Sequence, residues 1–429
     1  MHLTNLNLTD FRSYERLGLA LSPGISVLLG DNATGKTTLL EAIYFLATTR
    51  SHRSSSDAEL INRAAIADMG APPFSRLLAL VERARGDLRV EIVIARDAER
   101  EINQQVSGLA RKQVKINGVA RRAADLIGQV NVVMFAPEDM ALVTTAPAAR
   151  RRYLDMTISQ VDHRYMLSLA QYNKVLLQRN ALLRDIRDRG RNSSSPAVRE
   201  EMVYWNGELA QAGAYVSLRR QDFLLRLSAL AEPLHEQLVG TGAPLCLLYS
   251  SAVAPNVRAN LAPTLAAPRP PATPQLAAGI PQVHRLTEQV QTEFAAQLEA
   301  ARQDEARRGV SLIGPHRDDF SFSLGDGPQA SPLAVYGSRG QQRSAILALK
   351  LAELALMEQE VGDRPILLLD DILSELDASR RQFLLETVRA NPRQVLITGT
   401  AAADFEPSFL QDATRYRVAA GRVTELAED

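Results

Sequence analysis

Hydrophobic and polar positions alternate near the two ends of the chain and follow a helical period in its middle. The segments 3–8 ("LTNLNL") and 24–30 ("GISVLLG") have the pattern of strands, placed around the turn signal "SPG". A helical pattern follows at 37–47, and further strand patterns occur between 76 and 135. The first third of the chain therefore predicts mixed α/β structure.

The pattern changes near residue 147, where apolar residues begin to recur every three to four positions. This period runs over 148–189 and again over 197–238. Two helices of about 35 to 40 residues would each span roughly 50 Å at 1.5 Å per residue, which predicts an antiparallel helical arm. The Ala- and Pro-rich segment 252–281 has the composition of a disordered surface loop.

Alternating strand and helix patterns return after residue 310. Apolar runs in 364–371 and 393–398 predict buried strands, 379–390 predicts a helix, and 415–426 predicts a closing hairpin. The two chain ends then form one α/β domain that carries the middle as an insertion. We expect the divisions 1–146 (first part of the α/β domain), 147–300 (helical arm) and 301–429 (second part).

Composition adds little to this picture. Lys and Arg number 49 among 429 residues, and Asp and Glu also number 49, so the net charge does not indicate a partner. The single cysteine, Cys246, excludes an internal disulfide and a multi-cysteine zinc site. The N-terminus lacks a signal-peptide pattern, and no apolar run reaches the ~20 residues that span a membrane. We therefore expect a soluble protein of the reducing cytoplasm.

The stretch "GDNATGKTT" has the spacing of a phosphate-binding loop, G-x-x-x-x-G-K-S/T, between a predicted strand and a predicted helix. Backbone N–H groups of such a loop surround anionic oxygens. We expect Lys36 to reach the β- and γ-phosphates of ATP and Thr37 to bind Mg²⁺. The predicted nucleotide-binding residues are Gly30, Asp31, Asn32, Ala33, Thr34, Gly35, Lys36, Thr37 and Thr38.

Two carboxylates follow the apolar run "ILLL". Asp370, at the tip of the predicted strand, is expected to complete the Mg²⁺ site, and Asp371 to orient or deprotonate the attacking water. The alternative is a pair of solvated acids that cap a strand, and a phosphate loop in the same chain disfavours it.

A second glycine-rich stretch, "GSRGQQRS" at 337–344, also precedes a helical pattern. It lacks a lysine, yet a helix N-terminus with serine and glycine can donate N–H groups to a phosphate held elsewhere. Within one subunit it would compete with the first loop, so we expect it to face the ATP of a second copy. The alternative is an ordinary helix cap.

Other polar residues allow more than one interpretation. His316, Arg317 and Asp318 could be catalytic, although a polar loop packed beside the nucleotide domain is favoured. Basic residues of the helical arm could follow DNA phosphates or form a solvated helix face, because acids lie among them. These basic residues are Arg150, Arg151, Arg152, Lys174, Arg179, Arg184, Arg187, Arg189, Arg219 and Arg220.

The motifs, taken in order, resemble the RecF family of ABC-type ATPases. The resemblance rests on "DFRSY" (10–14), "GDNATGKTTLLEAIY" (30–44), "FAPEDMALV" (135–143), "RRRYLDMTISQVD" (150–162), "GPHRDDF" (314–320), "SRGQQRSAILALKLAEL" (338–354) and "LLLDDILSELD" (367–377). It covers most of the chain outside the Ala- and Pro-rich segment. The implied fold is α/β: an ABC-type P-loop ATPase head built from both chain ends, with an inserted α-helical arm.

The resemblance implies an ATP-dependent DNA-binding protein of recombinational repair, replication restart and the SOS response. It implies a weak, DNA-stimulated ATPase that dimerises with ATP on duplex DNA and on single-strand/duplex junctions. RecR and RecO are implied partners, with RecA loaded downstream at single-stranded gaps. The implied site residues are Lys36, Thr37 and Asp370 at ATP–Mg²⁺, Asp371 as the catalytic acid, Arg12 at the nucleotide, Ser338, Gly340 and Gln341 in the signature loop, and Asp377 facing the dimer.

Some positions depart from the family pattern. Thr38 stands where members often have Asn, and Asp371 stands where many related heads have Glu, which suggests slow hydrolysis. "TGT" at 398–400 departs from the usual run of threonines, so these residues are left out of the predicted site. Gln129 could sense Mg²⁺ but is also left out.

Two other functional classes are less consistent with the sequence. By resemblance, the ATPase subunit of a membrane transporter keeps its motifs close together and has no long arm, whereas Lys36 and Asp370 stand at opposite ends of this chain. An architectural protein that tethers DNA through long coiled coils would need sustained heptads, which are absent.

Overall fold

The computed structural model describes residues 1–54, 56–65, 72–96, 110–192, 195–240, 242–253, 281–325, 330–390 and 394–426. These residues form two compact units, Met1–Met140 with Glu353–Asp429, and Ala141–Ala352. The first unit is assembled from both chain ends. The unit limits differ from the expected divisions after 146 and 300, so the division into domains stays a prediction.

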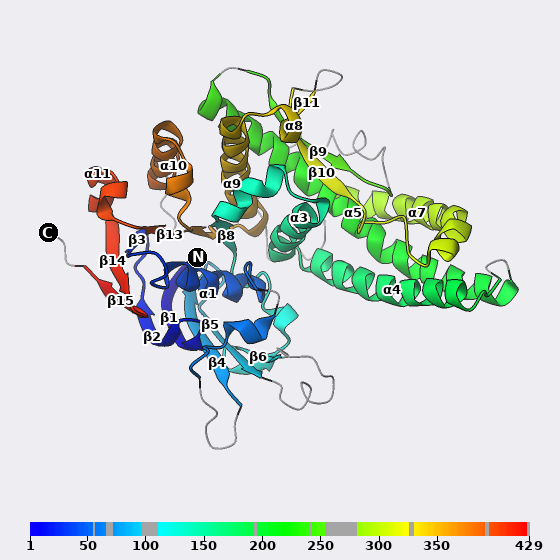
Figure 1. The fold of residues 1–429 in the computed structure, drawn as a ribbon, viewed down its shortest axis with the longest axis horizontal. Helices are drawn as coiled ribbons and strands as arrows, with labels where there is room; N and C mark the ends of the chain where they lie inside the picture. The colour runs from blue at the N-terminus through cyan, green and yellow to red at the C-terminus, as the bar shows by residue number, and fades with distance from the viewer. Residues whose placement is uncertain are drawn as a thin grey trace. The chain divides into compact units, whose positions relative to one another are not determined.

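A mostly parallel sheet forms the centre of the first unit (Figure 1). Its spatial order is β15 (Arg422–Glu425), β14 (Ala413–Ala419), β3 (Ile25–Leu29), β13 (Val395–Gly399), β12 (Ile366–Leu369) and β8 (Val132–Phe135). β14 to β8 run parallel, and β15 is antiparallel to β14. Every residue of β3, β12 and β13 is buried, as expected where helices or a second layer cover both faces.

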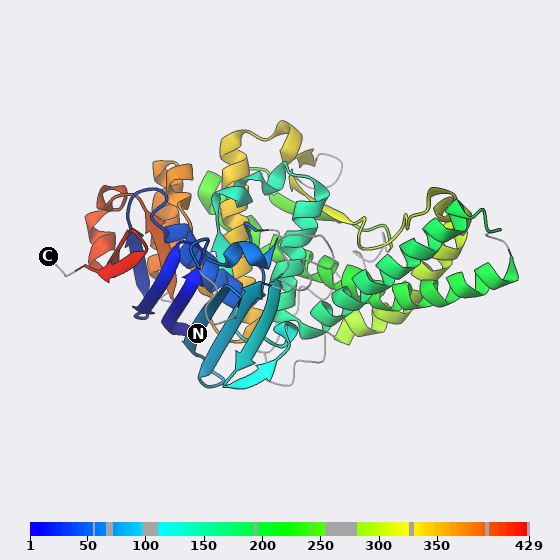
Figure 2. The same ribbon diagram turned by 60° about the horizontal axis from the view of Figure 1, so that its bottom comes forward.

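An antiparallel sheet forms a second layer of this unit, and Figure 2 shows its strands side by side. Its order is β2 (Tyr14–Ala20), β1 (His2–Phe11), β4 (Phe74–Glu82), β5 (Leu88–Arg96), β6 (Ala110–Ile116) and β7 (Val119–Arg121). Buried and accessible residues alternate along β4 and β5, so one face is in the core and the other meets solvent.

Helix α1 (Lys36–Thr48) fills the space between the two sheets. Its apolar residues share one hydrophobic core with the inner face of the antiparallel sheet and with β3, β8, β12 and β13. The unit also contains α10 (Ala378–Ala390), α11 (Pro407–Gln411) and the end of α9 (Arg339–Val361), which begins in the second unit. The predicted strands, the helix after the phosphate loop and the closing hairpin are confirmed.

The second unit is mainly helical. It contains α3 (Pro147–Val161), α4 (His163–Asp188), α5 (Pro196–Val239), α7 (Pro281–Arg308), α8 (Leu333–Tyr336) and the sheet β11 (Ser331–Pro332), β10 (Asp319–Leu324), β9 (Leu245–Ser250). The first of the two expected long helices is divided in two, so that expectation was wrong. The helix is interrupted at Asp162, whose carboxylate accepts a hydrogen bond from the Tyr165 N–H at 2.9 Å and caps α4. Residues 254–280, most of the predicted disordered loop, lie outside the described residues.

Buried ion pairs account for several basic residues of the arm. Arg179 is fully buried and binds Glu305 on α7 (2.5 Å), Asn206 on α5 (2.9 Å) and Ser311 (2.7 Å). Arg219 and Arg220 are also buried and pair with Asp162 and Asp155. These cations join helices inside the unit, so they are neither a solvated face nor a surface for DNA. Among the described helices, none is apolar and long enough to cross a membrane.

Candidate nucleotide site

The loop between β3 and α1 has a backbone conformation and close contacts that require small residues at particular positions. Gly35 has φ of 112°, and a Cβ there would lie 2.9 Å from the Tyr14 hydroxyl, which donates to the Gly35 carbonyl at 3.0 Å. A Cβ on Gly30 would lie 2.2 Å from the carbonyl oxygen of Val418. Ala33 also has positive φ, 65°. Larger side chains at Gly30 and Gly35 would therefore clash with the residues that surround the loop.

Lys36 is the first residue of α1, and its side chain reaches back to this loop. Its ammonium donates to the carbonyl oxygens of Gly30 (2.5 Å) and Asp31 (2.8 Å). Burial lowers the pKa of Lys36, and the nearby carboxylates of Asp371, Asp370 and Asp31 oppose that shift. Helix α1 begins without a side-chain cap or an acid in its first turn, so its N–H groups and dipole suit an anion.

Asp370 is bonded to two threonines from different elements. The hydroxyls of Thr37 and Thr398 lie 3.0 and 3.1 Å from its Oδ1 atom, and the Asp371 N–H donates to the Thr398 hydroxyl at 2.7 Å. Burial raises the pKa of Asp370, although both hydrogen bonds oppose the shift. These oxygen ligands fit Mg²⁺. Within the described residues no cluster of three or more His, Cys, Asp or Glu could hold a metal, so any ion here would depend on hydroxyl and ligand oxygens as well.

Asp371 has an unusual backbone. Its φ is 50°, in the left-handed region, at the N-cap of the short helix Ile372–Glu375. Its carboxylate is the first of the charges that oppose the lowering of the Lys36 pKa by burial. The predicted residues Lys36, Thr37, Asp370 and Asp371 are thus brought together, together with Thr398, which the sequence analysis left out. A polar residue at the carboxyl end of a buried parallel strand was the available signal.

Arg12 is fixed by a buried carboxylate on α1. Its Nε and Nη2 donate to Glu41 at 3.1 and 2.7 Å, and its Nη2 also contacts the Ser54 hydroxyl. Glu41 is fully buried and also receives the Ser51 hydroxyl. The sequence analysis missed Glu41, although a lone acid within the apolar pattern of "TTLLEAIY" was a usable signal.

The other loop residues are accessible. Asp31, Asn32 and Ala33 are exposed, Thr38 is partly buried, and the Thr34 hydroxyl donates to the Asp31 carbonyl at 2.8 Å.

The second glycine-rich stretch forms a capping box at the start of α9. The Gln341 N–H donates to the Ser338 hydroxyl at 3.2 Å, and the Ser338 N–H donates to the Gln341 side chain at 2.8 Å. A Cβ on Gly337 would lie 2.5 Å from the Leu333 carbonyl oxygen. This loop belongs to the second unit and the phosphate loop to the first. The cap is present, and a role toward a second copy stays a proposal.

Three further residues have local partners. Asp377 accepts the Arg380 N–H at 3.0 Å and caps α10. His316 lies between the Tyr172 hydroxyl (2.6 Å) and the Ser311 carbonyl (3.1 Å) in the second unit, and burial lowers its pKa to about 4. The Gln129 side chain receives a hydrogen bond from Arg83 at 2.9 Å.

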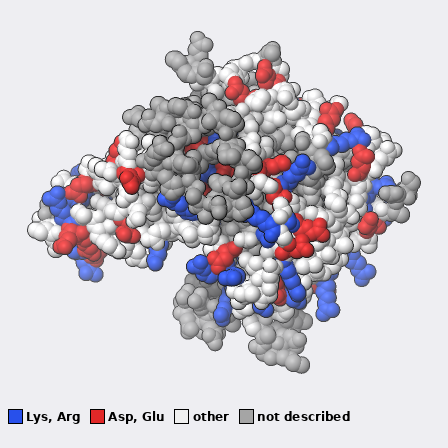
Figure 3. Space-filling model, turned by 180° about the vertical axis from the view of Figure 1, so that it is seen from behind, with Lys and Arg blue, Asp and Glu red and all other residues white. Residues whose placement is uncertain are grey.

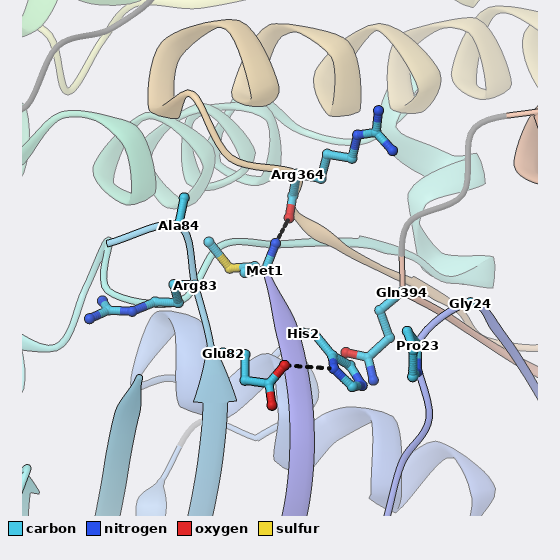
Figure 4. Close-up of a pocket in the computed structure, with 9 residues that line it drawn as sticks. All are labelled: Met1, His2, Pro23, Gly24, Glu82, Arg83, Ala84, Arg364 and Gln394. Atoms are coloured by element: carbon cyan, nitrogen blue, oxygen red, sulfur yellow. Dashed lines mark hydrogen bonds and ion pairs between the residues drawn. The ribbon is translucent and has the colours of Figure 1, made fainter. Parts of the chain in front are cut away.

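A pocket of about 360 Å³ lies away from the phosphate loop, at the amino ends of the parallel strands. Figure 4 shows its lining residues, among them His2 and Glu82, whose side chains are 3.6 Å apart. Pro23 and Gly24 precede β3, and Gln394 precedes β13. Ligands of open α/β sheets bind at the opposite edge, where the phosphate loop lies.

Comparisons with known proteins identify the family. The family model described as RecF/RecN/SMC N terminal domain matches residues 2–418. A protein of Roseiflexus castenholzii named "DNA replication and repair protein RecF" is 46% identical over 423 residues, 99% of each chain. The chain belongs to the RecF family.

Solved structures agree with the RecF family assignment. A chain described as "the recombination mediator protein RecF-ATPrS in RecFOR pathway" has 27% identity and a TM-score of 0.79, covering 99% of this chain and 98% of that one. An Smc head bound to a ScpA domain has 12% identity, a TM-score of 0.51 and coverage of 100% and 98%, and it supports the fold alone. The predicted ABC-type ATPase head with an inserted helical arm is therefore confirmed, as is membership of a DNA replication and repair family.

Proposed function

We propose that this RecF-family chain binds ATP with Mg²⁺ and hydrolyses it slowly, as a switch that clamps DNA during repair. The observation that carries the proposal is the set of hydrogen bonds that joins Thr37 of the phosphate loop to Asp370 and Thr398. The similarity to a chain described as RecF-ATP, with 26% identity and a TM-score of 0.77, supports the same ligand.

Each residue of the site has a defined role in this proposal. The loop N–H groups and Lys36 bind the phosphates, and Lys36 exchanges its bonds to the loop carbonyls for bonds to phosphate oxygens. Thr37 and Asp370 would hold Mg²⁺, which neutralises phosphate charge. Asp371 positions water with a side chain one methylene shorter than Glu, so the water is less well aligned and hydrolysis is slow. Arg12, held by Glu41, contacts the nucleotide.

The same proposal includes a dimer that depends on ATP. The capping box occupies the N–H groups of Ser338 and Gln341, while those of Arg339 and Gly340 have no acceptor within the helix and can reach a phosphate of a second copy. Val335 and Tyr336, directly before this loop, are 71% and 74% exposed. Association of two copies at this loop would cover these apolar side chains.

Partners and place in the cell follow from the family. We propose action with RecR and RecO to load RecA at single-stranded gaps, in the cytoplasm, with hydrolysis stimulated by DNA. A transporter ATPase is the alternative class, and the wide separation of Lys36 from Asp370 along the chain disfavours it.

The mass of the Asp371→Asn protein, measured by light scattering with and without Mg-ATP, tests the clamp. We expect a monomer without nucleotide and a dimer with it. Adding Ser338→Arg should prevent the dimer and leave ATP binding intact, because the larger side chain would meet the phosphate of the second copy. Asn173→Arg, at an exposed position of α4, is the matched control and should still dimerise. A mass that does not respond to ATP would disprove the clamp.

A further inference from the structure

The outer face of the antiparallel sheet of the first unit differs in charge from the chain as a whole. Leu8, Leu17 and Leu77 point into the core, so the residues next to them in each strand point outward. The outward cations are Arg16 of β2, Arg76 of β4, Arg89 of β5, and Arg111 and Lys115 of β6, against Glu82 and Glu91 on the same face. Among the described residues of these strands, five cations and two carboxylates give the face a net charge of +3, whereas the whole chain is neutral.

Three of these arginines keep their charge available to solvent. Arg76 and Lys115 both pair with Glu91, at 2.8 and 3.8 Å. Arg16, Arg89 and Arg111 are exposed and make no ion pair within the described part of the chain. In the lower part of Figure 3, Lys and Arg side chains are visible with Asp and Glu side chains among them.

The arm does not offer a comparable set of cations. Arg150 binds Asp319 at 2.7 Å, and Arg179, Arg219 and Arg220 are used in buried pairs. Arg187 on α4 and Arg189, directly after it, pair with the α4 residues Asp188 and Asp185. Most of the positive charge that the sequence places on the arm is therefore neutralised within the unit.

We propose that this sheet face binds the phosphate backbone of duplex DNA, and the inference rests on the proposed function. Four interstrand spacings separate β2 from β6 in the sheet, which is about 19 Å at ~4.8 Å per spacing. Duplex DNA carries about eleven phosphate charges over that length, at one per ~1.7 Å. Asn5, Asn7 and Gln113 lie among the cations on this face and supply neutral donors to phosphate oxygens.

The composition of the face favours DNA over an acidic protein surface. Protein interfaces contain a core of buried aromatic and apolar side chains. The large apolar residues that are exposed on these strands' outer face are Phe74 and Leu80, at 38% and 39%. They stand on one strand, separated by Arg76 and the partly buried Leu78, so they do not form a continuous anchor. Scattered cations with amide side chains between them suit a backbone of repeating phosphates.

Binding of the full chain with Mg-ATP to a fluorescent duplex, measured by anisotropy over a salt series, tests the surface. In the triple variant Arg16→Ala, Arg89→Ala, Arg111→Ala we expect the slope of log K against log salt to become less negative by about 3, roughly 1 per arginine. Affinity at low salt should fall at least about tenfold. The single variant Arg89→Ala should change the slope by about 1 and retain ATP binding.

The matched control removes the same charge elsewhere, by Lys174→Ala, Arg184→Ala and Arg417→Ala at exposed positions, and should keep the wild-type slope. If the two triple variants have equal slopes and affinities, the sheet face is not the binding surface, although DNA binding itself stands. If the unaltered chain with Mg-ATP does not bind the duplex, both this inference and the proposed function fail.

Discussion

The carboxylate of Glu41 is the one acid on α1, and it receives two N–H groups of Arg12. If Glu41 acts by holding Arg12 toward the nucleotide, Glu41→Gln should weaken ATP binding by about 10- to 100-fold, the equivalent of ~1.5–3 kcal/mol for hydrogen bonds to a charged group. Titration of ATP into the variant measures this.

The double variant Glu41→Gln with Arg12→Ala tests whether Glu41 affects ATP binding through Arg12. It should bind ATP no more weakly than Arg12→Ala alone, because Glu41 then has no guanidinium to hold. Losses that simply add would contradict the positioning role of Glu41.

His316 should make stability depend on pH. Its pKa falls from 6.5 to about 4 in the folded chain because burial disfavours the charged ring. Between these values the unfolded chain binds a proton that the folded chain does not, so stability falls as the pH drops from 6.5 to 4, by up to about 3 kcal/mol. Denaturant unfolding at pH 7 and 5 measures the difference. His316→Gln should lose this part of the pH dependence, whereas His163→Gln, at an exposed position, should keep it.

The sequence predicted the residues of the site better than their supports. Lys36, Thr37 and Asp370 belong to a contiguous motif or a strand tip, so their positions follow from local pattern. Thr398, Glu41 and Tyr14 act through contacts across different elements, and local periodicity does not report which elements become neighbours.

At the scale of elements, α5 contains two glycines with opposite environments. A Cβ on Gly213 would lie 2.7 Å from Phe294 of α7 and 2.9 Å from Tyr172 of α4, so three helices meet at this position. Gly213→Ala should destabilise the unit by about 1–3 kcal/mol through overpacking. Gly207 has no atom within 4 Å of an added Cβ, and Gly207→Ala should stabilise by about 0.5–1 kcal/mol. Thermal unfolding of both variants compares them, and a stabilising Gly213→Ala would refute the close approach.

The helical arm illustrates what periodicity alone misses. The pattern continued through Asp162, but the carboxylate of that residue caps a new helix and the chain turns there. Helix α7 was not expected, because its pattern begins directly after the Ala- and Pro-rich segment. The sequence therefore predicted the helical class of the arm but not its division into helices.

At the scale of the whole molecule, the two-ended assembly of the first unit was predictable and the role of the arm cations was not. Apolar runs at both ends have the length and β-branched content of buried parallel strands, which must share one sheet. The sequence pattern predicted that the arm arginines lie on the surface. In the fold, acids such as Glu305 and Asp155 lie beside several of them. Which charges meet inside a unit depends on long-range contacts that a single sequence does not display.

The position of β3 in the sheet has a consequence for folding during translation. Its two neighbours in the sheet are β13 and β14, which the ribosome makes more than 360 residues later. At roughly 5–20 residues per second, the phosphate-loop strand waits on the order of 20–70 s for a partner. During translation the apolar side chains of β3 and its unpaired backbone groups lack their native partners, so chaperones or transient contacts have to shield them. A ribosome that stalls before residue 395 therefore releases a chain whose central strand has neither of its neighbours, a natural substrate for quality control.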